Sequence, residues 1–264
     1  VFLTIDSAAY AGEDNKYTIG EQVTFKSKIL DEDRTIIVYL PASHGISDKD
    51  YPVMYLLDGG FHYHHASGIV QFLSTQGRIP EMILVAITNV DRTRDFTPTH
   101  VESQPTTGGG EKFISFISKE LMPFIDRNYQ VNDYKLLVGH SLGGLFAGWS
   151  LVKKPDLFNS YIAISPYMMY DNEYVVDEIE AKLKSKYNNV NFYMTLGNEP
   201  TYVKTLERFE WIINDRTPKG FNYTWNKYPN DDHGSVVHLS IYNGLEYIFS
   251  DWPLPPESFN DGLQ

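Results

Sequence analysis

The distribution of hydrophobic and polar positions changes character after the first fifty residues. Before that point, residues 22–30 and 34–40 alternate imperfectly between apolar and polar side chains around the acidic turn "DED", which predicts an antiparallel pair of strands. After it, short continuous apolar runs recur along the chain. Runs of this kind are typical of strands buried on both faces of a parallel sheet. They cover residues 53–57, 82–87, 135–139, 161–164 and 190–196.

Segments with helical periodicity separate these runs, and a further strand is expected at 221–228. Strands that alternate with helices indicate βαβ units joined by right-handed crossovers. We therefore expect an α/β fold, with a mostly parallel sheet of about eight strands, an antiparallel amino-terminal edge and helices on both faces. The expected helices cover residues 61–76, 111–128, 143–153, 173–187, 201–214 and 235–250.

The length of 264 residues fits one large domain, which we expect to span residues 1–250. The remaining stretch, 251–264, is rich in proline and is expected to be a tail or a linker. Residues 88–110 form the longest stretch without periodicity. Long loops in compact domains are usually functional, so this segment is the expected lid or binding loop.

Composition excludes several classes of function. A formal net charge of -12 opposes phosphate binding, which argues against nucleic acid and anionic membrane surfaces as partners. The chain has no cysteine, so disulfides and cysteine-based zinc sites are excluded. No apolar run is long enough to insert into a membrane. The chain begins with Val1 instead of methionine, which favours removal of a leader and a periplasmic or secreted location, with a cytoplasmic one as the alternative.

The most informative motif follows the apolar run 135–139. The sequence "GHSLG" at 139–143 has the pattern G-x-S-x-G between a predicted buried strand and a predicted helix, which is the setting of a nucleophile elbow. The glycines let the two backbones approach while the turn holds the serine in an unfavourable conformation. The alternative is that these glycines serve only close packing. We interpret Ser141 as a nucleophile.

A serine nucleophile requires a base, and the base requires a carboxylate that orients it. In this arrangement the order along the chain is serine, acid, histidine. Two histidines follow Ser141. His233 lies in a predicted loop before the last helix, whereas His238 lies inside that helix. We assign the base to His233 and interpret His238 as a residue of the helix face.

The acid is expected just after the strand 190–196, at the carboxyl edge of the sheet. Glu199 occupies this place. Its alternative role is that of an acidic residue in the first turn of a helix. Asp171 is the main rival, and two further acids lie too close to the base along the chain: Asp231 and Asp232.

An oxyanion hole needs two backbone N–H donors, one from the residue after the nucleophile and one from the loop after the third strand. Leu142 is the first donor. Gly60, which follows the strand 53–57 in "LLDGGF", is the candidate for the second, with Phe61 as the neighbouring option.

Five ordered motifs make the chain resemble the putative-esterase family of α/β-hydrolases: "YPVMYLLDGG", "VAITNVDRTRDFTPT", "FISKELMPFIDRNY", "GHSLGGLFA" and "DDHGSV". This family includes enterobactin and salmochelin trilactone esterases, feruloyl esterases, formylglutathione-hydrolase-like enzymes and mycolyltransferases. The stretch "RTRDFTP" is most similar to the periplasmic siderophore esterases of the IroE type. The resemblance covers roughly residues 20–250.

The resemblance implies an α/β-hydrolase that cleaves a small-molecule ester through an acyl-enzyme, without a cofactor. Ser141 would attack and His233 would carry the proton, while Leu142 and Gly60 would bind the oxyanion. Some siderophore esterases of the family use a Ser-His dyad, so the resemblance leaves the role of Glu199 open. The alternatives are a feruloyl or acetyl esterase on carbohydrate esters, an acyltransferase, and a non-catalytic binding module. The oligomeric state stays open.

Further candidate residues have two readings each. Arg92 and Arg94 lie in the segment 88–110 and could bind a carboxylate or catecholate oxygen of the substrate, with Phe61 near the same pocket. Asp91 and Asp95 flank the arginines, so the arginines are equally expected to form local ion pairs with these acids. We take Asp95 as structural.

The stretch "FHYHH" contains His62, His64 and His65, but it lacks a carboxylate at ligand spacing. We therefore predict no metal site there and expect one of these histidines at the mouth of the pocket. The aromatic residues of "SPYMMY" at 165–170 could stack on an aromatic acyl group or could simply fill the core.

Overall fold

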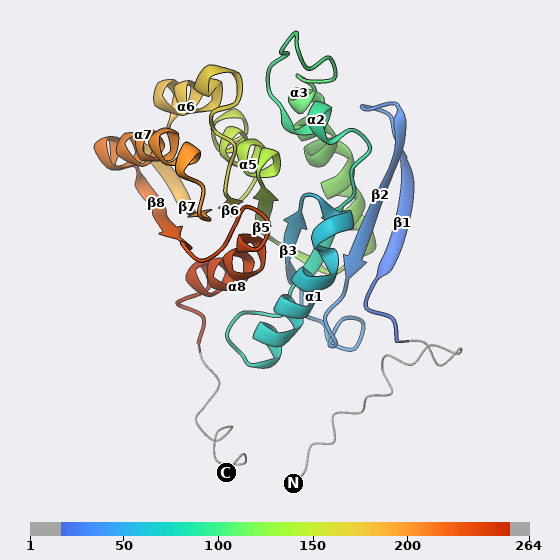
Figure 1. Ribbon diagram of the computed structural model, residues 1–264. Coiled ribbons are helices and arrows are strands. Elements are labelled where there is room, and N and C mark those ends of the chain that lie inside the picture. Colours follow the sequence, from blue (N-terminus) through green and yellow to red (C-terminus); the bar gives the residue numbers. More distant parts are fainter. Residues whose placement is uncertain (1–16, 254–264) are drawn as a thin grey trace.

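The computed structural model describes residues 17–253, and within them eight strands form one sheet (Figure 1). The strand order is β1-β2-β4-β3-β5-β6-β7-β8. β2 runs antiparallel to β1 and to β4, and every other neighbouring pair is parallel. The expected mostly parallel sheet with an antiparallel amino-terminal edge is confirmed. The strands are β1 (Glu21–Ser27), β2 (Glu32–Tyr39), β3 (Tyr51–Leu56), β4 (Ile83–Ile87), β5 (Val131–His140), β6 (Ser160–Ile164), β7 (Lys186–Leu196) and β8 (Lys219–Lys227).

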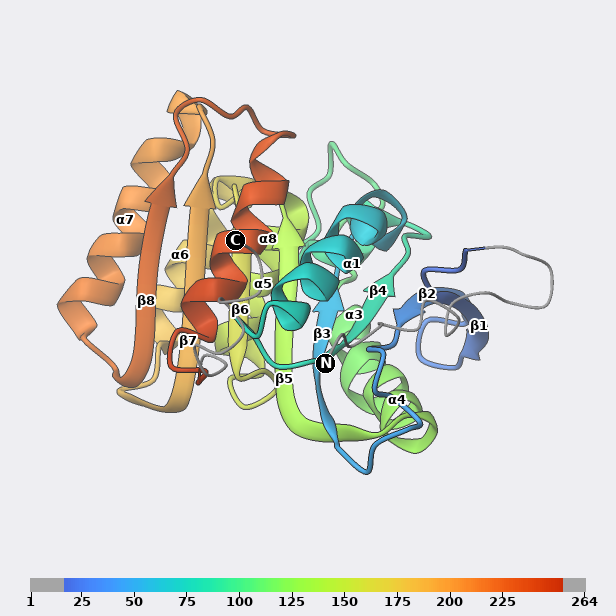
Figure 2. The same ribbon diagram turned by 90° about the horizontal axis from the view of Figure 1, so that it is seen from below.

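Helices cover both faces of the sheet. α1 (Gly59–Thr75) and α8 (Val236–Ile248) lie side by side on one face, in front of the strands in Figure 2. A second set of helices covers the other face, most of them in the upper part of Figure 1. They are α3 (Gly110–Phe116), α4 (Met122–Asn128), α5 (Leu142–Lys153), α6 (Tyr170–Lys182) and α7 (Pro200–Arg216).

The two helical layers explain why the central strands are apolar at every position. Along β3, Val53 and Tyr55 pack against the layer of α3 to α7, whereas Met54 and Leu56 pack against the layer of α1 and α8. Successive strand residues point to opposite faces, so a strand with helices on both sides buries all of them. Each of the six residues of β3 is buried.

The prediction of one uninterrupted helix over 111–128 is wrong in detail. α3 and α4 are joined by a π-helical turn, η2 (Ile117–Leu121). Pro123 lies in the first turn of α4 and has no N–H to donate to the preceding turn. A π turn is a known way to accommodate such a local break in the hydrogen-bond ladder.

Two other expectations are also corrected. The helix expected over 173–187 ends at Lys182, because β7 begins at Lys186. The segment 88–110 contains a short helix, α2 (Arg92–Phe96), which hydrophobic periodicity did not show because the helix is only five residues long. Its signal was the capping residue: Asp91 accepts a hydrogen bond from the backbone N–H of Arg94 at 2.9 Å.

Residues 254–264, most of the expected tail, lie outside the described residues. Over 17–253 no helix is both long enough and apolar enough to cross a bilayer.

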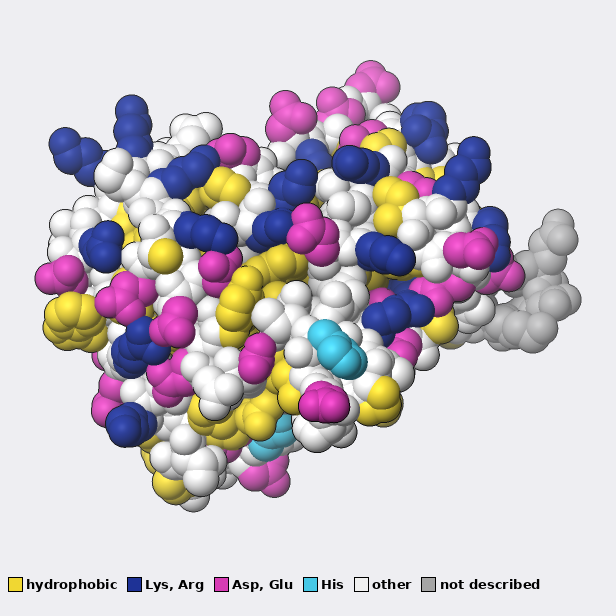
Figure 3. All heavy atoms as spheres, turned by 90° about the horizontal axis from the view of Figure 1, so that it is seen from above, with side chains coloured by type: hydrophobic (Ala, Val, Ile, Leu, Met, Phe, Trp, Pro, Cys, Tyr) yellow, Lys and Arg dark blue, Asp and Glu magenta, His cyan; other side chains and the backbone are white. Residues whose placement is uncertain are grey.

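The side of the molecule on which α3 and α6 lie carries both signs of charge, interspersed around a strip of hydrophobic side chains (Figure 3). The excess of acidic residues therefore does not form a uniform negative field on this side.

Candidate active site

Ser141 occupies a strained turn between β5 and α5. Its φ of 59° and ψ of -114° lie outside the regions that L-residues normally adopt. The turn is held from the neighbouring strand end, because the Ser141 N–H donates to Ile164 O at 2.9 Å and its carbonyl accepts from Tyr167 N at 3.0 Å. A Cβ added at Gly139 would lie 2.2 Å from the Gly143 carbonyl oxygen, so only glycine fits there. The strand, turn and helix expected from the sequence are all present.

The structure brings His233 and Glu199 together. Glu199 follows β7 at the start of α7, and His233 lies in the loop between β8 and α8. The Nδ1 atom of His233 is 2.5 Å from Glu199 Oε1. The other carboxylate oxygen accepts from the Ser165 hydroxyl at 2.5 Å and from the Gly197 N–H at 3.3 Å. Since the carboxylate occupies Nδ1, the Nε2 atom of His233 is the one left for proton transfer.

Backbone contacts hold these two loops together. Asn198 N–H donates to the Asp231 carbonyl at 2.6 Å, and Tyr228 N–H donates to the Leu196 carbonyl at 2.8 Å. The side chain of Glu199 is only 8% exposed, whereas that of His233 is 41% exposed. A buried carboxylate therefore orients an imidazole that solvent and substrate can reach.

Two aromatic rings lie against the ring of His233. The ring of His140, the residue before Ser141, has its centroid 4.4 Å from that of His233. The ring of Tyr202 lies 5.8 Å from His233 on another side. The elements after β5, β7 and β8 thus converge on one site.

Burial affects both of these rings. It raises the pKa of Tyr202 to about 12, with the Glu199 charge as a second cause. Burial is also the main cause that lowers the pKa of His140 to about 3, and the neighbouring His233 and His62 add to this effect. His140 is therefore neutral near pH 7, and the phenol of Tyr202 is protonated.

The alternative candidates for the acid and the base lie elsewhere in the structure. Asp171 lies in a left-handed turn at the start of α6, with a φ of 46°. Asp232 accepts hydrogen bonds from the backbone N–H groups of Gly234 and Ser235, in the turn that leads into α8. His238 is an exposed residue of α8, as expected. Among the acids considered from the sequence, Glu199 is the one that contacts His233.

The candidate oxyanion donors lie at the amino ends of two helices. Leu142 is the first residue of α5 and Gly60 the second residue of α1. N–H groups in a first helical turn have no carbonyl one turn earlier to bond, so they are available to a ligand. The neighbouring option, Phe61, already donates its N–H to the Asp58 carbonyl at 2.9 Å. This contact favours Gly60 as the second donor.

Arg92 connects the two candidate donor loops. Its Nε donates to Asp58 Oδ1 at 2.6 Å, and its Nη2 donates to Asp58 Oδ2 and to the His140 carbonyl, both at 3.0 Å. Asn89 also donates to Asp58 Oδ1, at 2.6 Å. The partner of Arg92 is thus a distant carboxylate and not a flanking one.

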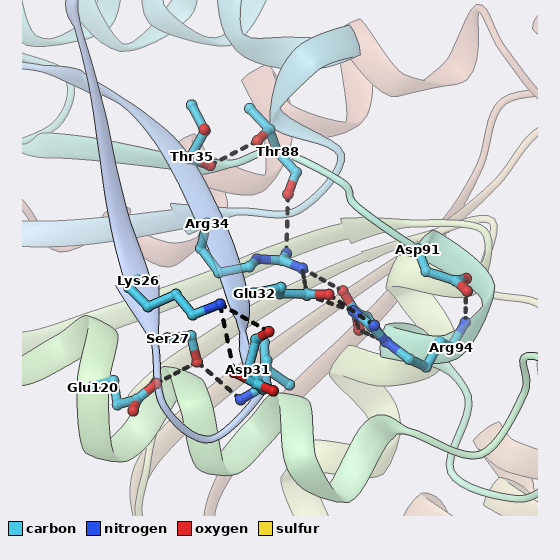
Figure 4. Close-up of polar contacts among 12 residues, drawn as sticks. Lys26, Ser27, Asp31, Glu32, Arg34, Thr35, Thr88, Asp91, Arg94 and Glu120 are labelled. Carbon is cyan, nitrogen blue, oxygen red and sulfur yellow. Dashed lines mark hydrogen bonds and ion pairs between the residues drawn. The ribbon is translucent and has the colours of Figure 1, made fainter.

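Arg94 belongs to an ion-pair network between α2 and β2 (Figure 4). Its Nη1 and Nη2 donate to Glu32, at 2.9 and 2.6 Å, and its Nε donates to Asp95 at 2.8 Å. Arg34 donates to the same two carboxylates and is fully buried. All three guanidinium nitrogens of Arg94 are therefore engaged within the protein, and Asp95 has the structural role expected for it.

The three histidines of "FHYHH" do not share a site. His62 Nδ1 and His65 Nε2 are 3.1 Å apart, whereas His64 is exposed. Burial lowers the pKa of His65 to about 4. Among residues 17–253, no three side chains of His, Asp or Glu are grouped so that they could hold a metal ion.

A cavity of about 410 Å³ lies at the opposite edge of the sheet, where β3 and β5 begin. Tyr51, Tyr134, Phe249 and Trp252 contribute to its lining, and none of the residues predicted for the site does so. The candidate site is instead formed at the carboxyl ends of the parallel strands, where ligands of open α/β sheets bind.

The parallel sheet and the strained serine turn define the chain as an α/β-hydrolase. Residues 27–228 match the model of the family described as putative esterase, and the chain belongs to this family of carboxylic ester hydrolases. Ferri-bacillibactin esterase BesA of Bacillus subtilis is 31% identical over 89% of this chain and 92% of its own length.

Solved structures agree with this assignment. An IroE-like serine hydrolase from Shewanella oneidensis has a TM-score of 0.85 at 31% identity, over 89% of this chain and 82% of its own. The siderophore hydrolase EstB from Aspergillus nidulans has a TM-score of 0.78 at 24% identity, over 91% of this chain and 99% of its own, and supports the fold alone.

Sequence reasoning missed four residues of the site. Asp58 and Asn89 follow the ends of β3 and β4, Ser165 follows the end of β6, and Tyr202 lies in the first turn of α7. Their common signal is their place directly after a strand or at the start of a helix, at the carboxyl edge of the sheet. The sequence alone does not show which of these four residues contact one another.

Proposed function

We propose that this protein hydrolyses its ester substrate by nucleophilic catalysis, with Ser141 as the nucleophile, His233 as the base and Glu199 as the orienting acid. The observation that carries the proposal is the contact between the buried Glu199 carboxylate and His233 Nδ1, beside a serine held at a positive φ. A serine hydroxyl is a weak nucleophile unless such a base is present. The description of the Shewanella relative as a serine hydrolase supports the same chemistry.

The reaction has two halves. Ser141 Oγ attacks the ester carbonyl carbon while His233 Nε2 takes the hydroxyl proton, and the N–H groups of Leu142 and Gly60 stabilise the oxyanion. The bond to the alkoxy oxygen then breaks, and His233 returns the proton to this oxygen, which releases an alcohol. Water attacks the acyl-enzyme with His233 again as base, which releases the acid and restores Ser141.

We propose siderophore esters of the trilactone type as the substrates. The relative of 31% identity is a ferri-bacillibactin esterase, and this similarity favours the same class of ester here. The Nη1 group of Arg92 is the guanidinium nitrogen that has no bond to another described residue, so it can reach an anionic oxygen of the substrate. Arg94 could do so only by giving up an ion pair. Phe61 is 77% exposed beside Gly60 and can cover an aromatic ring of the substrate.

Fluorophosphonate labelling with mass spectrometry tests the nucleophile. We expect one adduct on Ser141, and we expect Ser141→Ala to lose most hydrolysis of p-nitrophenyl acetate while a small residual rate survives. The matched control is Ser118→Ala, on η2, which should retain full activity. An adduct elsewhere, or unchanged hydrolysis by Ser141→Ala, would refute the mechanism.

A substrate comparison tests the ester class. Ferric and iron-free trilactone siderophores should be cleaved with a higher kcat/KM than feruloyl esters and acetylated sugars. A preference for either of the latter would overturn the substrate proposal and leave the assignment of Ser141 intact.

A further inference from the structure

Ser165 is a buried residue of the site that the reaction described above does not use. It follows β6 directly and is 0% exposed. Its φ of 38° lies in the left-handed region, where a residue with a Cβ is strained. Strain of this kind persists only where the surrounding structure imposes it, and it clusters at functional sites. The backbone of Ser165 therefore indicates a role beyond packing.

The hydroxyl of Ser165 has two partners, and both belong to the segment that carries the acid. It donates to Glu199 Oε2 at 2.5 Å and accepts from the Gly197 N–H at 3.2 Å. The directions of these bonds are fixed, because a carboxylate oxygen can only accept and a backbone N–H can only donate. The Gly197 nitrogen is itself 3.3 Å from Oε2. The Ser165 hydroxyl thus makes the shorter of the two hydrogen bonds to the carboxylate oxygen that does not contact His233.

The end of β6 also holds the turn at Ser141. The carbonyl of Ile164 accepts from the Ser141 N–H at 2.9 Å, and the Tyr167 N–H donates to the Ser141 carbonyl at 3.0 Å. Residues 164–167 therefore contact the serine turn through their backbone and the acid through the side chain of Ser165. One short segment connects two members of the proposed triad.

We propose, on the basis of the function proposed above, that Ser165 is a positioning residue that acts through Glu199. Its hydroxyl fixes the plane of the carboxylate so that Oε1 faces His233 Nδ1, and the segment 164–167 keeps this pair in register with Ser141. Supporting hydrogen bonds of this kind lock the orientation of a side chain that the chemistry depends on. The proton transfers of the reaction stay on His233, and Ser165 neither gains nor loses a proton.

Loss of the hydroxyl frees the carboxylate. Without Ser165 Oγ, Oε2 retains only the 3.3 Å contact with the Gly197 nitrogen, so the carboxylate can turn away from the imidazole. A small misplacement of a catalytic group is costly, and we expect Ser165→Ala to lower kcat by roughly 10-fold. KM should change by less than about 2-fold, because the fully buried side chain does not touch the substrate. Both halves of the reaction use His233, so the loss appears whichever half limits kcat.

The variant Ser165→Gly separates the hydroxyl from the stability of the fold. Glycine adopts a positive φ without strain, so this variant should melt at a higher temperature than Ser165→Ala. Both variants lack the hydroxyl, and we expect both to lose kcat to the same extent. A loss of kcat that followed the melting temperatures instead would show that the residue serves only the stability of the fold, and would overturn the proposal.

The matched control is Ser150→Ala, on α5. This serine is also fully buried, but its hydroxyl donates to the Ala147 carbonyl, at 2.8 Å, within the helix. The variant should retain full kcat. A loss equal to that of Ser165→Ala would mean that any buried serine hydroxyl has this effect, which would contradict a specific role for Ser165.

The dependence on the acid is tested by measuring kcat for p-nitrophenyl acetate in Ser165→Ala, Glu199→Gln and the double variant, after thermal melting has shown that each is folded. If Ser165 acts through the acid, Ser165→Ala should change kcat by less than about 2-fold once Glu199 is replaced. Full kcat in Ser165→Ala, or the same loss with and without the carboxylate, would overturn the proposal. If Ser141→Ala or Glu199→Gln retains full activity, the triad proposed above fails together with this inference; if both are impaired and the two losses simply multiply, this inference alone fails.

Discussion

Arg92 and Asp58 form a two-point ion pair that connects the two loops expected to bind the oxyanion. Asp58 is 3% exposed and immediately precedes the glycines at the start of α1. The same guanidinium also binds the carbonyl of His140, the residue before Ser141. One side chain therefore fixes the distance between the turn at Ser141 and the loop that carries Gly60. Such a fixed spacing is what stabilisation of an oxyanion requires.

A double-mutant cycle tests this coupling. We expect Arg92→Met to lower the free energy of unfolding by about 1–3 kcal/mol, because it leaves a buried carboxylate unpaired while the arginine itself is partly exposed. Asp58→Asn should cost less, and the double variant should cost less than the sum. Urea unfolding measures these values, and p-nitrophenyl acetate hydrolysis should fall by at least about tenfold in Arg92→Met. Strict additivity of the two substitutions would disprove the coupling.

Much of the fold follows from local pattern in the sequence. The continuous apolar runs identified the central strands because those strands are covered on both faces, as Val53 and Met54 show by facing opposite layers. The order of Ser141, Glu199 and His233 along the chain is also readable, because each follows a strand of a parallel sheet and the carboxyl ends of such strands meet at one edge.

The remaining features depend on contacts between distant positions. A local sequence pattern does not predict that Arg92 binds Asp58 instead of its neighbour Asp91, because a long arginine side chain can reach either acid. The choice is made by the tertiary structure, which brings Arg92 to Asp58 and to the carbonyl of His140. Tyr202 could likewise have been a core residue, and only the tertiary structure places its ring beside that of His233.

The carboxylate of Glu199 distinguishes a triad from a dyad. We expect Glu199→Gln to lower kcat by roughly 10²-fold to 10⁴-fold, because an amide can no longer stabilise the charged imidazole or fix its tautomer. Steady-state hydrolysis measures this loss. Asp171→Asn is the matched control and should retain activity. A Glu199→Gln enzyme with nearly full kcat would show that Ser141 and His233 act as a dyad.

The network around Glu32 predicts unequal roles for two neighbouring arginines. Arg34 is 0% exposed and binds Asp95, which is 1% exposed, so Arg34→Met should lower the free energy of unfolding by about 3–5 kcal/mol. The side chain of Arg94 is 30% exposed, and Arg94→Met should cost only about 1 kcal/mol or less. Urea unfolding of the two variants checks the difference. Equal effects would mean that burial does not set the strength of these pairs.

His140 should make the protein less stable in mild acid. Its pKa is about 3 in the folded protein, whereas the ordinary pKa of a solvated histidine, which applies to the unfolded chain, is 6.5. Between these values the unfolded chain binds a proton that the folded protein excludes, so the free energy of unfolding decreases as pH falls from 6.5 towards 3. At about 1.4 kcal/mol for each unit, the loss at pH 5 is about 2 kcal/mol. His140→Asn and His140→Gln should remove this contribution, so urea unfolding at pH 8 and pH 5 should differ less in either variant than in the wild type. Identical pH dependence in all three proteins would mean that the pKa of His140 is the same in the folded and the unfolded protein, and burial would then not keep this imidazole neutral at pH 5.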